Sequence, residues 1–379
     1  MIEQSNSLLL NEEALNLCAD PKKPVFIYEW LRYLDRILPA AQKIYSVGDT
    51  YSLFETINFC NDILKGRDDS PTHLPVKLAA LQCLGAMYET LGRLVGRSYE
   101  ESFHLMIKWL KNAESQGRAE LLHTFAKLVK GLGFGASSIH KDLYKIVKGH
   151  MSDRVMAVRI AALNCLTVLV PEYVFLYTNE VESISTLCFK ALESSNYEVR
   201  LAVARLFAVL FCAAMDPPKS RLPATNSKTQ SKVMSVEECF GILSHGFLRG
   251  GIGGFLKTGT VAVTGGQKET RIGVALAYVT LIRELGPLWL EKNHVFVTKH
   301  LMELTTKAGP LAYTNNVNQA DEVVYMRRCV GYILRGTVGT ILGEHAQIAV
   351  CKQLGAILAD CINSFGKLRA ADSKSYGQK

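Results

Sequence analysis

The chain has 379 residues, enough for two or three ordinary domains or for one elongated array. Hydrophobic residues make up 48% of it and charged residues 21%, as in folded proteins. A net charge of +8 is mild for this length, and the basic residues are spread along helix surfaces rather than gathered on one face. Nucleic-acid binding is therefore not predicted. Helix-forming residues dominate and no long segment alternates as a strand would, so we predict an all-α protein.

The ten cysteines include no Cys-x-x-Cys pair and are scattered over apolar helical faces. Such cysteines pack as small hydrophobes, which favours free thiols in a reducing compartment. The segment from Met1 to Glu13 carries acids and no basic stretch, so we predict no signal peptide. The longest fully apolar run, residues 206–215, has half the length that a membrane span requires. We expect a cytoplasmic protein with no direct membrane span.

Helix signals begin after a polar segment, residues 1–24, that we predict to be irregular. An apolar side over residues 25–38 predicts the first helix, and Pro75 suits the first turn of a helix that runs to residue 91. Ser98 with Glu101, and Ser235 with Glu238, have the spacing of capping boxes that open further helices.

The repeating helical pattern predicts one array over residues 25–369, followed by a disordered tail at 370–379. Three stretches break the pattern and predict inserted loops. The first is rich in Pro, Ser, Thr and Lys, the second in Gly and the third in Asn. Their approximate bounds are 216–234, 250–267 and 307–320.

One helical signature occurs twice, at residues 153–162 and 194–203, and in each copy a Val-Arg pair precedes small apolar residues. The basic residue recurs at 41-residue intervals through four positions, and two later positions repeat the pattern after insertions. A period of about 40–47 residues is typical of HEAT and armadillo arrays. We predict an α-solenoid of about six helix pairs. The basic ladder consists of Lys77, Arg118, Arg159, Arg200, Arg271 and Arg327.

Two roles are open for the ladder. It could form an anion-binding stripe, or each arginine could bridge acidic and backbone groups of neighbouring repeats while its stem covers apolar surface. The second role is favoured, because a residue that recurs once per repeat is well placed to join repeats. Trp30, Trp109 and Trp289 are likewise interpreted as core residues rather than ligand platforms.

No motif predicts catalysis. The glycine-rich stretch 250–266 lacks both the Walker loop and the dinucleotide fingerprint. The nine histidines form no His-x-x-x-His or Cys/His cluster with metal spacing. We therefore expect a protein that is not an enzyme and has no catalytic residue, cofactor or metal. Stacked helix pairs offer long surfaces, and binding other proteins is their usual use.

Several segments resemble the HEAT repeat-containing protein 5 family. They are residues 7–14, 24–31, 113–118, 187–193 and 246–251, and the likeness extends over nearly the whole chain. Members of this family are far longer, so the chain resembles their N-terminal part. A helical stretch that the family has after Gln42 is missing here, as in a shortened splice form.

The resemblance implies a non-enzymatic role in clathrin-adaptor traffic, including endocytosis, endosome-to-Golgi retrograde transport and protein localisation. The implied partners are aftiphilin, gamma-synergin and adaptor protein complex one, and the implied location is peripheral to the Golgi, endosomes and endocytic vesicles. Two other functions remain open at this point. One is a cargo carrier of the karyopherin kind, which would favour an acidic inner surface. The other is a regulatory scaffold subunit of an enzyme such as a phosphatase.

Overall fold

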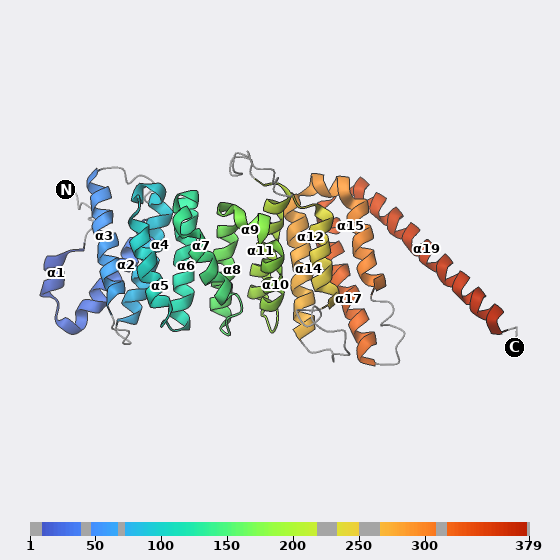
Figure 1. Ribbon diagram of the computed structural model, residues 1–379, viewed down its shortest axis with the longest axis horizontal. Helices are drawn as coiled ribbons and strands as arrows, with labels where there is room; N and C mark the ends of the chain where they lie inside the picture. Colours follow the sequence, from blue (N-terminus) through green and yellow to red (C-terminus); the bar gives the residue numbers. More distant parts are fainter. Residues whose placement is uncertain are drawn as a thin grey trace. The chain divides into compact units, whose positions relative to one another are not determined.

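The computed structural model describes six stretches of the chain, residues 10–38, 47–66, 73–217, 233–249, 266–307 and 317–376. These residues form α-helices, short 3-10 turns and connecting segments, with no strand among them (Figure 1). The all-α prediction is confirmed. The chain divides into two compact units. Unit 1 comprises residues 1–191, 196–202 and 216–233, and unit 2 comprises residues 192–195, 203–215 and 234–379.

Unit 1 is a series of antiparallel helices. Its α-helices are α1 (Glu12–Leu17), α2 (Lys23–Ile37), α3 (Val47–Lys65), α4 (Leu74–Leu91), α5 (Ser98–Leu110), α6 (Ser115–Leu132), α7 (Ser137–His150), α8 (Met156–Leu169), α9 (Val174–Asn179) and α10 (Val181–Ala191). Short 3-10 turns separate some of them, namely η1 (Asp20–Lys22), η2 (Gly92–Val95), η3 (Gly133–Ala136) and η4 (Val170–Glu172).

The helices of unit 1 pack as pairs in two layers. Helices α2, α4, α6 and α8 lie side by side in one layer, and α3 packs against α5 in the other. Helices α3, α5 and α7 each pack on the helix that follows them in the chain, giving the pairs α3/α4, α5/α6 and α7/α8 (Figure 1). The turns within the pairs lie along one edge of the unit, the ladder edge. The turns between one pair and the next lie along the opposite edge.

Helix α11 (Tyr197–Met215) follows α10 and is divided between the units at residue 202. Unit 2 continues with α12 (Val236–Arg249), α14 (Gly266–Leu285), α15 (Pro287–Lys307), α17 (Val317–Gly336), α18 (Val338–Ile341) and α19 (Glu344–Tyr376). Here α12 packs on α14 and α15 on α17, while α14 lies beside α17 and α15 beside α19. The contacts of the described helices thus define five pairs, α3/α4, α5/α6, α7/α8, α12/α14 and α15/α17, where the period predicts about six.

Local chemistry explains several helix ends. Pro75 lies in the first turn of α4, as predicted. The glycines that end α4 and α6 are 41 residues apart, and both have the left-handed backbone that favours glycine, with φ +53° at Gly92 and φ +54° at Gly133. The 41-residue repeat therefore also includes the glycines that end these helices.

Only one of the two predicted capping boxes is present. At the start of α12 the Ser235 N–H donates to Glu238 Oε2 at 2.8 Å, and the Glu238 N–H donates to Ser235 Oγ at 3.2 Å. The box predicted at Ser98 is wrong. Ser98 is already inside α5, where its hydroxyl donates to the Val95 carbonyl at 2.9 Å, because the 3-10 turn before it starts the helix one residue early.

Two predictions about the chain ends need correction. The segment 1–24 is not irregular throughout, since α1 and η1 form within it, and the Asn11 side chain caps α1 by accepting the Ala14 N–H at 2.9 Å. The predicted disordered tail begins too early, because α19 continues to Tyr376. The predicted loops near 216–234, 250–267 and 307–320 lie mostly outside the described residues. No helix within the described stretches is both long and apolar enough to cross a bilayer.

Cysteine burial gives a first testable result. Cys165 lies in the core, and burial raises the pKa of its thiol to about 12, whereas Cys351 on α19 is exposed. Because the thiolate is the reactive form, we expect iodoacetamide at pH 8 to modify Cys351 within minutes and Cys165 only after unfolding in urea. Peptide mass spectrometry of pulse-labelled protein measures both rates. Equal rates in native buffer would contradict the burial of Cys165.

Candidate functional site

Five of the six ladder residues lie on the second helix of a pair, and Arg200 lies on α11. Lys77 is on α4, Arg118 on α6, Arg159 on α8, Arg200 on α11, Arg271 on α14 and Arg327 on α17. The first five lie near the start of their helices, which places those of unit 1 along the ladder edge (Figure 1). The basic residues that recur in the sequence therefore recur at equivalent places in the first five of these helices.

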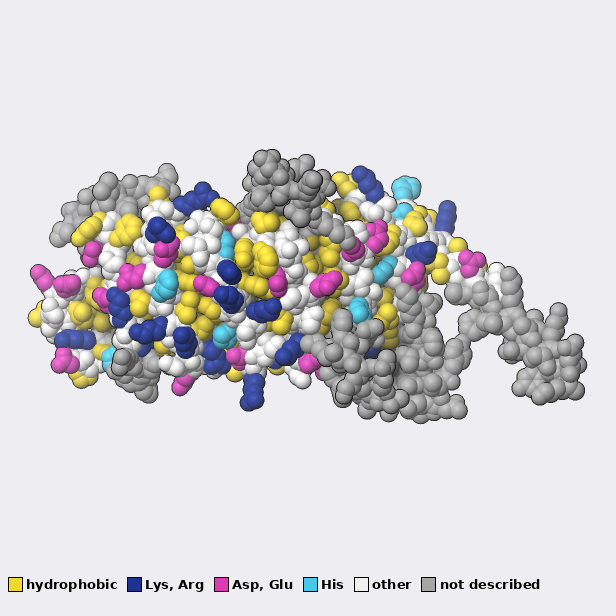
Figure 2. All heavy atoms as spheres, viewed as in Figure 1, with side chains coloured by type: hydrophobic (Ala, Val, Ile, Leu, Met, Phe, Trp, Pro, Cys, Tyr) yellow, Lys and Arg dark blue, Asp and Glu magenta, His cyan; other side chains and the backbone are white. Residues whose placement is uncertain are grey.

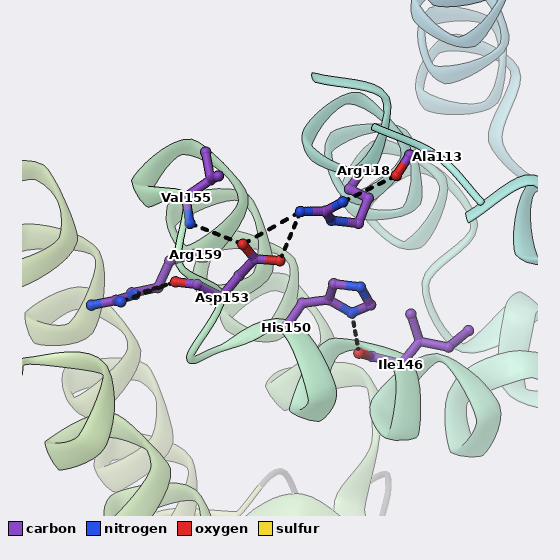
Figure 3. Close-up of polar contacts among 7 residues, drawn as sticks. All are labelled: Ala113, Arg118, Ile146, His150, Asp153, Val155 and Arg159. Carbon is purple, nitrogen blue, oxygen red and sulfur yellow. Dashed lines mark hydrogen bonds and ion pairs between the residues drawn. The ribbon is translucent and has the colours of Figure 1, made fainter. Parts of the chain in front are cut away.

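The best-defined part of the ladder joins successive turns through Asp153 (Figure 3). Arg118 Nη1 donates to the Ala113 carbonyl at 3.0 Å, and its Nη2 lies 3.2 Å from Asp153 Oδ2 in the next repeat. Asp153 Oδ1 also accepts the Val155 N–H at 2.9 Å, which fixes the turn before α8. One carboxylate thus links α6 to the turn between α7 and α8.

Arg159 extends this connection to the following repeat. Its Nε and Nη2 donate to the Asp153 carbonyl at 3.1 and 2.9 Å, and its Nη1 donates to the carbonyl of Ala191, the last residue of α10, at 2.8 Å. The residue is only 7% exposed. Hydrogen bonds from a charged donor contribute about 1.5–3 kcal/mol each, and a buried carbonyl left without a donor costs a similar amount.

Lys77 and Arg271 also contact nearby carbonyls or rings. Lys77 is buried, donates from Nζ to the Gly66 carbonyl at 2.6 Å and lies 5.5 Å from the centre of the Trp109 ring. Arg271 is buried and donates from Nε to the Phe247 carbonyl, near the end of α12, at 3.0 Å. Placing a cation at the C-terminal end of a helix is favourable, because that end carries partial negative charge.

Two positions depart from this arrangement. Arg200 is half-buried and donates from Nε to the Asn196 carbonyl, just before its own helix, at 3.0 Å. Arg327 is exposed on α17 and lies well inside the helix rather than at its start. Because the best-placed guanidinium groups are directed at the protein's own backbone, we propose a structural rather than an anion-binding role for the ladder.

The tryptophans occupy apolar surroundings. Trp109 is buried beneath Lys77, and the Trp30 ring meets Phe59 edge-on at 5.6 Å. Trp289 borders a cluster of rings around Phe240, and the centroids of the Trp289 and Phe240 rings are 6.5 Å apart. Trp109 is thus a core residue as predicted, whereas Trp30 and Trp289 are only half-buried and lie at the margin of the core.

Other candidate chemistry is sparse within the described stretches. They contain no group of three His, Cys, Asp or Glu side chains placed to hold a metal ion. The glycine-rich segment 250–266 lies almost entirely outside them. One cavity of about 410 Å³ opens between α2, α3 and α4, with Ile27, Ile63 and Val76 among its apolar lining residues and Lys23 and Asp62 among its polar ones. Asp62 pairs with Lys65, Lys23 pairs with Asp20, and Lys77, which also lines the cavity, donates to the Gly66 carbonyl, so these charges already have partners.

A second polar connection between repeats involves Tyr144 on α7. Its hydroxyl donates to Glu180 Oε2 at 2.7 Å, and Lys148 Nζ lies 3.6 Å from the same oxygen. The hydrogen bond from Tyr144, aided by the charge of Lys148, lowers the pKa of Glu180 below the ordinary 4.5. Burial, reinforced by the adjacent carboxylate, raises the pKa of Tyr144.

This contact predicts a pH effect. A carboxyl whose pKa is lowered by folding stabilises the protein above its unfolded pKa, and that stability is lost as the pH falls through the folded pKa. Tyr144→Phe should therefore raise the pKa of Glu180 and make unfolding less pH-dependent between pH 5 and 3. Carboxyl-detected NMR titration and urea unfolding at both pH values measure this. Tyr197→Phe, at an exposed tyrosine, should change neither, and identical titrations for all three proteins would disprove the contact.

Comparisons with known proteins give distant likenesses. None of the known protein families has a profile that matches the chain. The chain is 26% identical over 266 residues to Protein SWEETIE of Arabidopsis thaliana, an alignment that covers 67% of the chain but 11% of SWEETIE. The chain thus spans about a tenth of the length of this relative.

Among solved structures, importin beta is similar with a TM-score of 0.46 and 12% identity, over 86% of this chain and 37% of importin beta. Kap121p bound to Pho4p gives a TM-score of 0.45 and 11% identity, over 93% and 36% of the two chains. The fold assignment rests on the packing of the described helix pairs themselves.

Proposed function

We propose that the chain is a non-enzymatic protein-binding scaffold in clathrin-adaptor-linked membrane traffic. Endocytosis, retrograde transport from endosomes to the Golgi, and protein localisation are the processes it would serve. Its proposed partners are aftiphilin, gamma-synergin and adaptor protein complex one. Its proposed location is the cytoplasmic surface of the Golgi, endosomes and endocytic vesicles.

One observation carries this proposal. Three of the segments that resemble the HEAT repeat-containing protein 5 family supply the carbonyl groups that ladder arginines bind. Ala113 accepts from Arg118, Ala191 from Arg159 and Phe247 from Arg271. The residues that carry the resemblance thus include those that join the repeats, as expected if the same array is built in both.

The architecture favours binding over catalysis. Paired helices leave the outer side chains of each helix free for contact, and charged and apolar groups are interspersed on the face drawn in Figure 2. In the layer formed by α2, α4 and α6, Arg32 donates to Gln82 at 2.9 Å and Gln82 donates to Glu120 at 3.1 Å. These side chains span three helices in one polar row. Such a surface suits recognition of an extended protein partner.

Affinity purification of the tagged chain from cytosol tests the proposal. We expect aftiphilin, gamma-synergin and subunits of adaptor protein complex one to be enriched at least tenfold over a tag-only control. Enrichment of a small GTPase with nucleoporins would replace the proposal with a karyopherin-like carrier, and a phosphatase catalytic chain would indicate a regulatory scaffold. Absence of all three proposed partners would overturn it.

A further inference from the structure

The edge of unit 1 opposite the ladder carries a second periodic row, made of large apolar side chains in solvent. Leu94 lies in η2, Phe134 in η3 and Phe175 in α9, shortly after η4. Their exposed fractions are 58%, 57% and 41%. They follow one another at intervals of 40 and 41 residues, so three successive repeats each present one of them after the second helix of a pair, in a 3-10 turn in the first two repeats and at the start of α9 in the third.

The turns hold these side chains outward because their neighbours are fixed in the core. Val95 is 1% exposed, while Ala136 and Leu176 are fully buried. The Tyr99 hydroxyl donates to the Gly135 carbonyl at 3.1 Å and so ties the turn of Phe134 to α5. Exposed apolar residues scattered singly are normal on a protein surface, but these three recur with the repeat and lie along one edge, which makes the row a candidate interaction site.

The charged residues beside the row indicate that its partner carries negative charge. Arg97 is 83% exposed and pairs with Glu100, which is 29% exposed. Lys130 is 66% exposed and pairs with Glu89, which is 32% exposed. Arg93, next to Leu94, is exposed as well. In both pairs the carboxylate is less exposed than the cation, so the outer charge of each pair is positive.

The spacing of the row indicates the form of the partner. Helices in adjacent pairs pack about 8–10 Å apart, so equivalent turns recur at about that distance. Seven residues of an α-helix rise about 10.5 Å. We propose that the row Leu94, Phe134 and Phe175 binds an acidic amphipathic helix of a partner protein, with a large apolar residue at every seventh position. This deepens the proposed scaffold function and rests on it.

In the proposed complex, the partner's apolar residues contact the three exposed side chains. Its flanking carboxylates pair with Arg93, Arg97 and Lys130, which would give specificity and a faster association rate. A lipid bilayer could also accept apolar side chains beside cations, but it gives no reason for a fixed repeat. The regular spacing therefore favours a helix.

The test uses the full chain and fluorescein-labelled synthetic peptides that are long enough to hold three heptads. The probe peptide is rich in Glu and Ala and has Leu at every seventh position. A control peptide has the same composition with Leu at every fifth. Fluorescence anisotropy at low salt measures both affinities. We expect the probe to bind at least tenfold more tightly than the control peptide, and to weaken at least fivefold at 0.5 M NaCl.

The row itself is tested by the triple variant Leu94→Ser, Phe134→Ser, Phe175→Ser, which should lose at least tenfold in affinity for the probe. The matched control is Val155→Ser with Tyr197→Ser. These two residues are 39% and 59% exposed at the ladder edge, and their replacement should leave binding unchanged. Circular dichroism confirms that each variant is folded.

Three outcomes overturn the inference. They are equal binding of both peptides, undiminished binding by the triple variant, and absence of any binding. If the row instead serves a membrane, phosphatidylcholine vesicles with phosphatidylserine as the minor component would co-sediment with the wild type and not with the triple variant, while the probe binds neither. Failure here leaves the scaffold proposal standing if the affinity purification still recovers its partners.

Discussion

Replacement of Arg159 by alanine should lower the free energy of unfolding of unit 1 by about 3 kcal/mol. The change removes the hydrogen bonds that one buried guanidinium donates, and it leaves the carbonyl groups of Asp153 and Ala191 without this donor. Arg159→Lys should cost roughly half as much, because an ammonium keeps the charge but cannot span both carbonyls in a fixed fork. Urea unfolding followed by circular dichroism measures the losses.

The control for this prediction is Arg154→Ala, five residues earlier and exposed. It removes the same charge from the same turn and should change stability by less than about 0.5 kcal/mol. If the Arg159 and Arg154 variants unfold at the same urea concentration, the ladder does not join the repeats, and its alternative role as an anion-binding stripe would have to be reconsidered.

Gly131→Ala should destabilise unit 1 by about 3 kcal/mol. Gly131 lies in the last turns of α6, where the helix crosses α4 at close range. A Cβ at this position would collide with the carbonyl group of Tyr88 and the backbone of Glu89. Backbone cannot move aside as a side chain can, so the two helices would have to separate and expose packed core. Thermal and urea unfolding report the change.

Gly149 provides the matched comparison. It also lies in a helix, α7, but a Cβ there would meet no atom within 4 Å. Since glycine lowers helix stability relative to alanine, Gly149→Ala should leave stability unchanged or raise it by about 0.5 kcal/mol. A Gly131 variant as stable as the Gly149 variant would mean that α4 and α6 are not in close contact.

The sequence predicts the fold well because each repeat packs its two helices in the same way. The 41-residue interval between Arg118 and Arg159 recurs in the helix-ending glycines Gly92 and Gly133, so a single period predicts both the pairing of helices and the positions of the turns. The reciprocal capping box at Ser235 is also readable, since both of its partners lie within one helical turn.

Contacts between repeats are much harder to predict. Asp153 lies 35 residues from Arg118 in a signature that repeats, yet the corresponding position in the next copy is Ser194. No spacing rule could therefore identify Asp153 as the shared acceptor. The same holds for Trp109 beneath Lys77, because the pairing depends on how two helices from different repeats are rotated.

Short helices and exposed apolar residues are also hard to predict from the sequence. Helix α1 forms six residues around a side-chain cap at Asn11, which is too short for a periodic apolar stripe. The apolar row at Leu94, Phe134 and Phe175 was readable from its 40- and 41-residue intervals. The intervals alone do not distinguish it from the core, because an apolar residue in a helical repeat is ordinarily a core residue and exposure is visible only in the structure.

The most direct test of the repeat architecture is the distance between equivalent positions on successive second helices. Gln82, His123 and Asn164 are 41 residues apart on α4, α6 and α8, and none of them is buried. Spin labels attached through a genetically encoded azide leave the ten native cysteines untouched. Electron paramagnetic resonance should give a separation of about 10 Å for the pairs 82/123 and 123/164, and about 20 Å for 82/164. Unequal neighbouring distances, or a pair 82/164 closer than either neighbouring pair, would contradict a regular stack of paired helices.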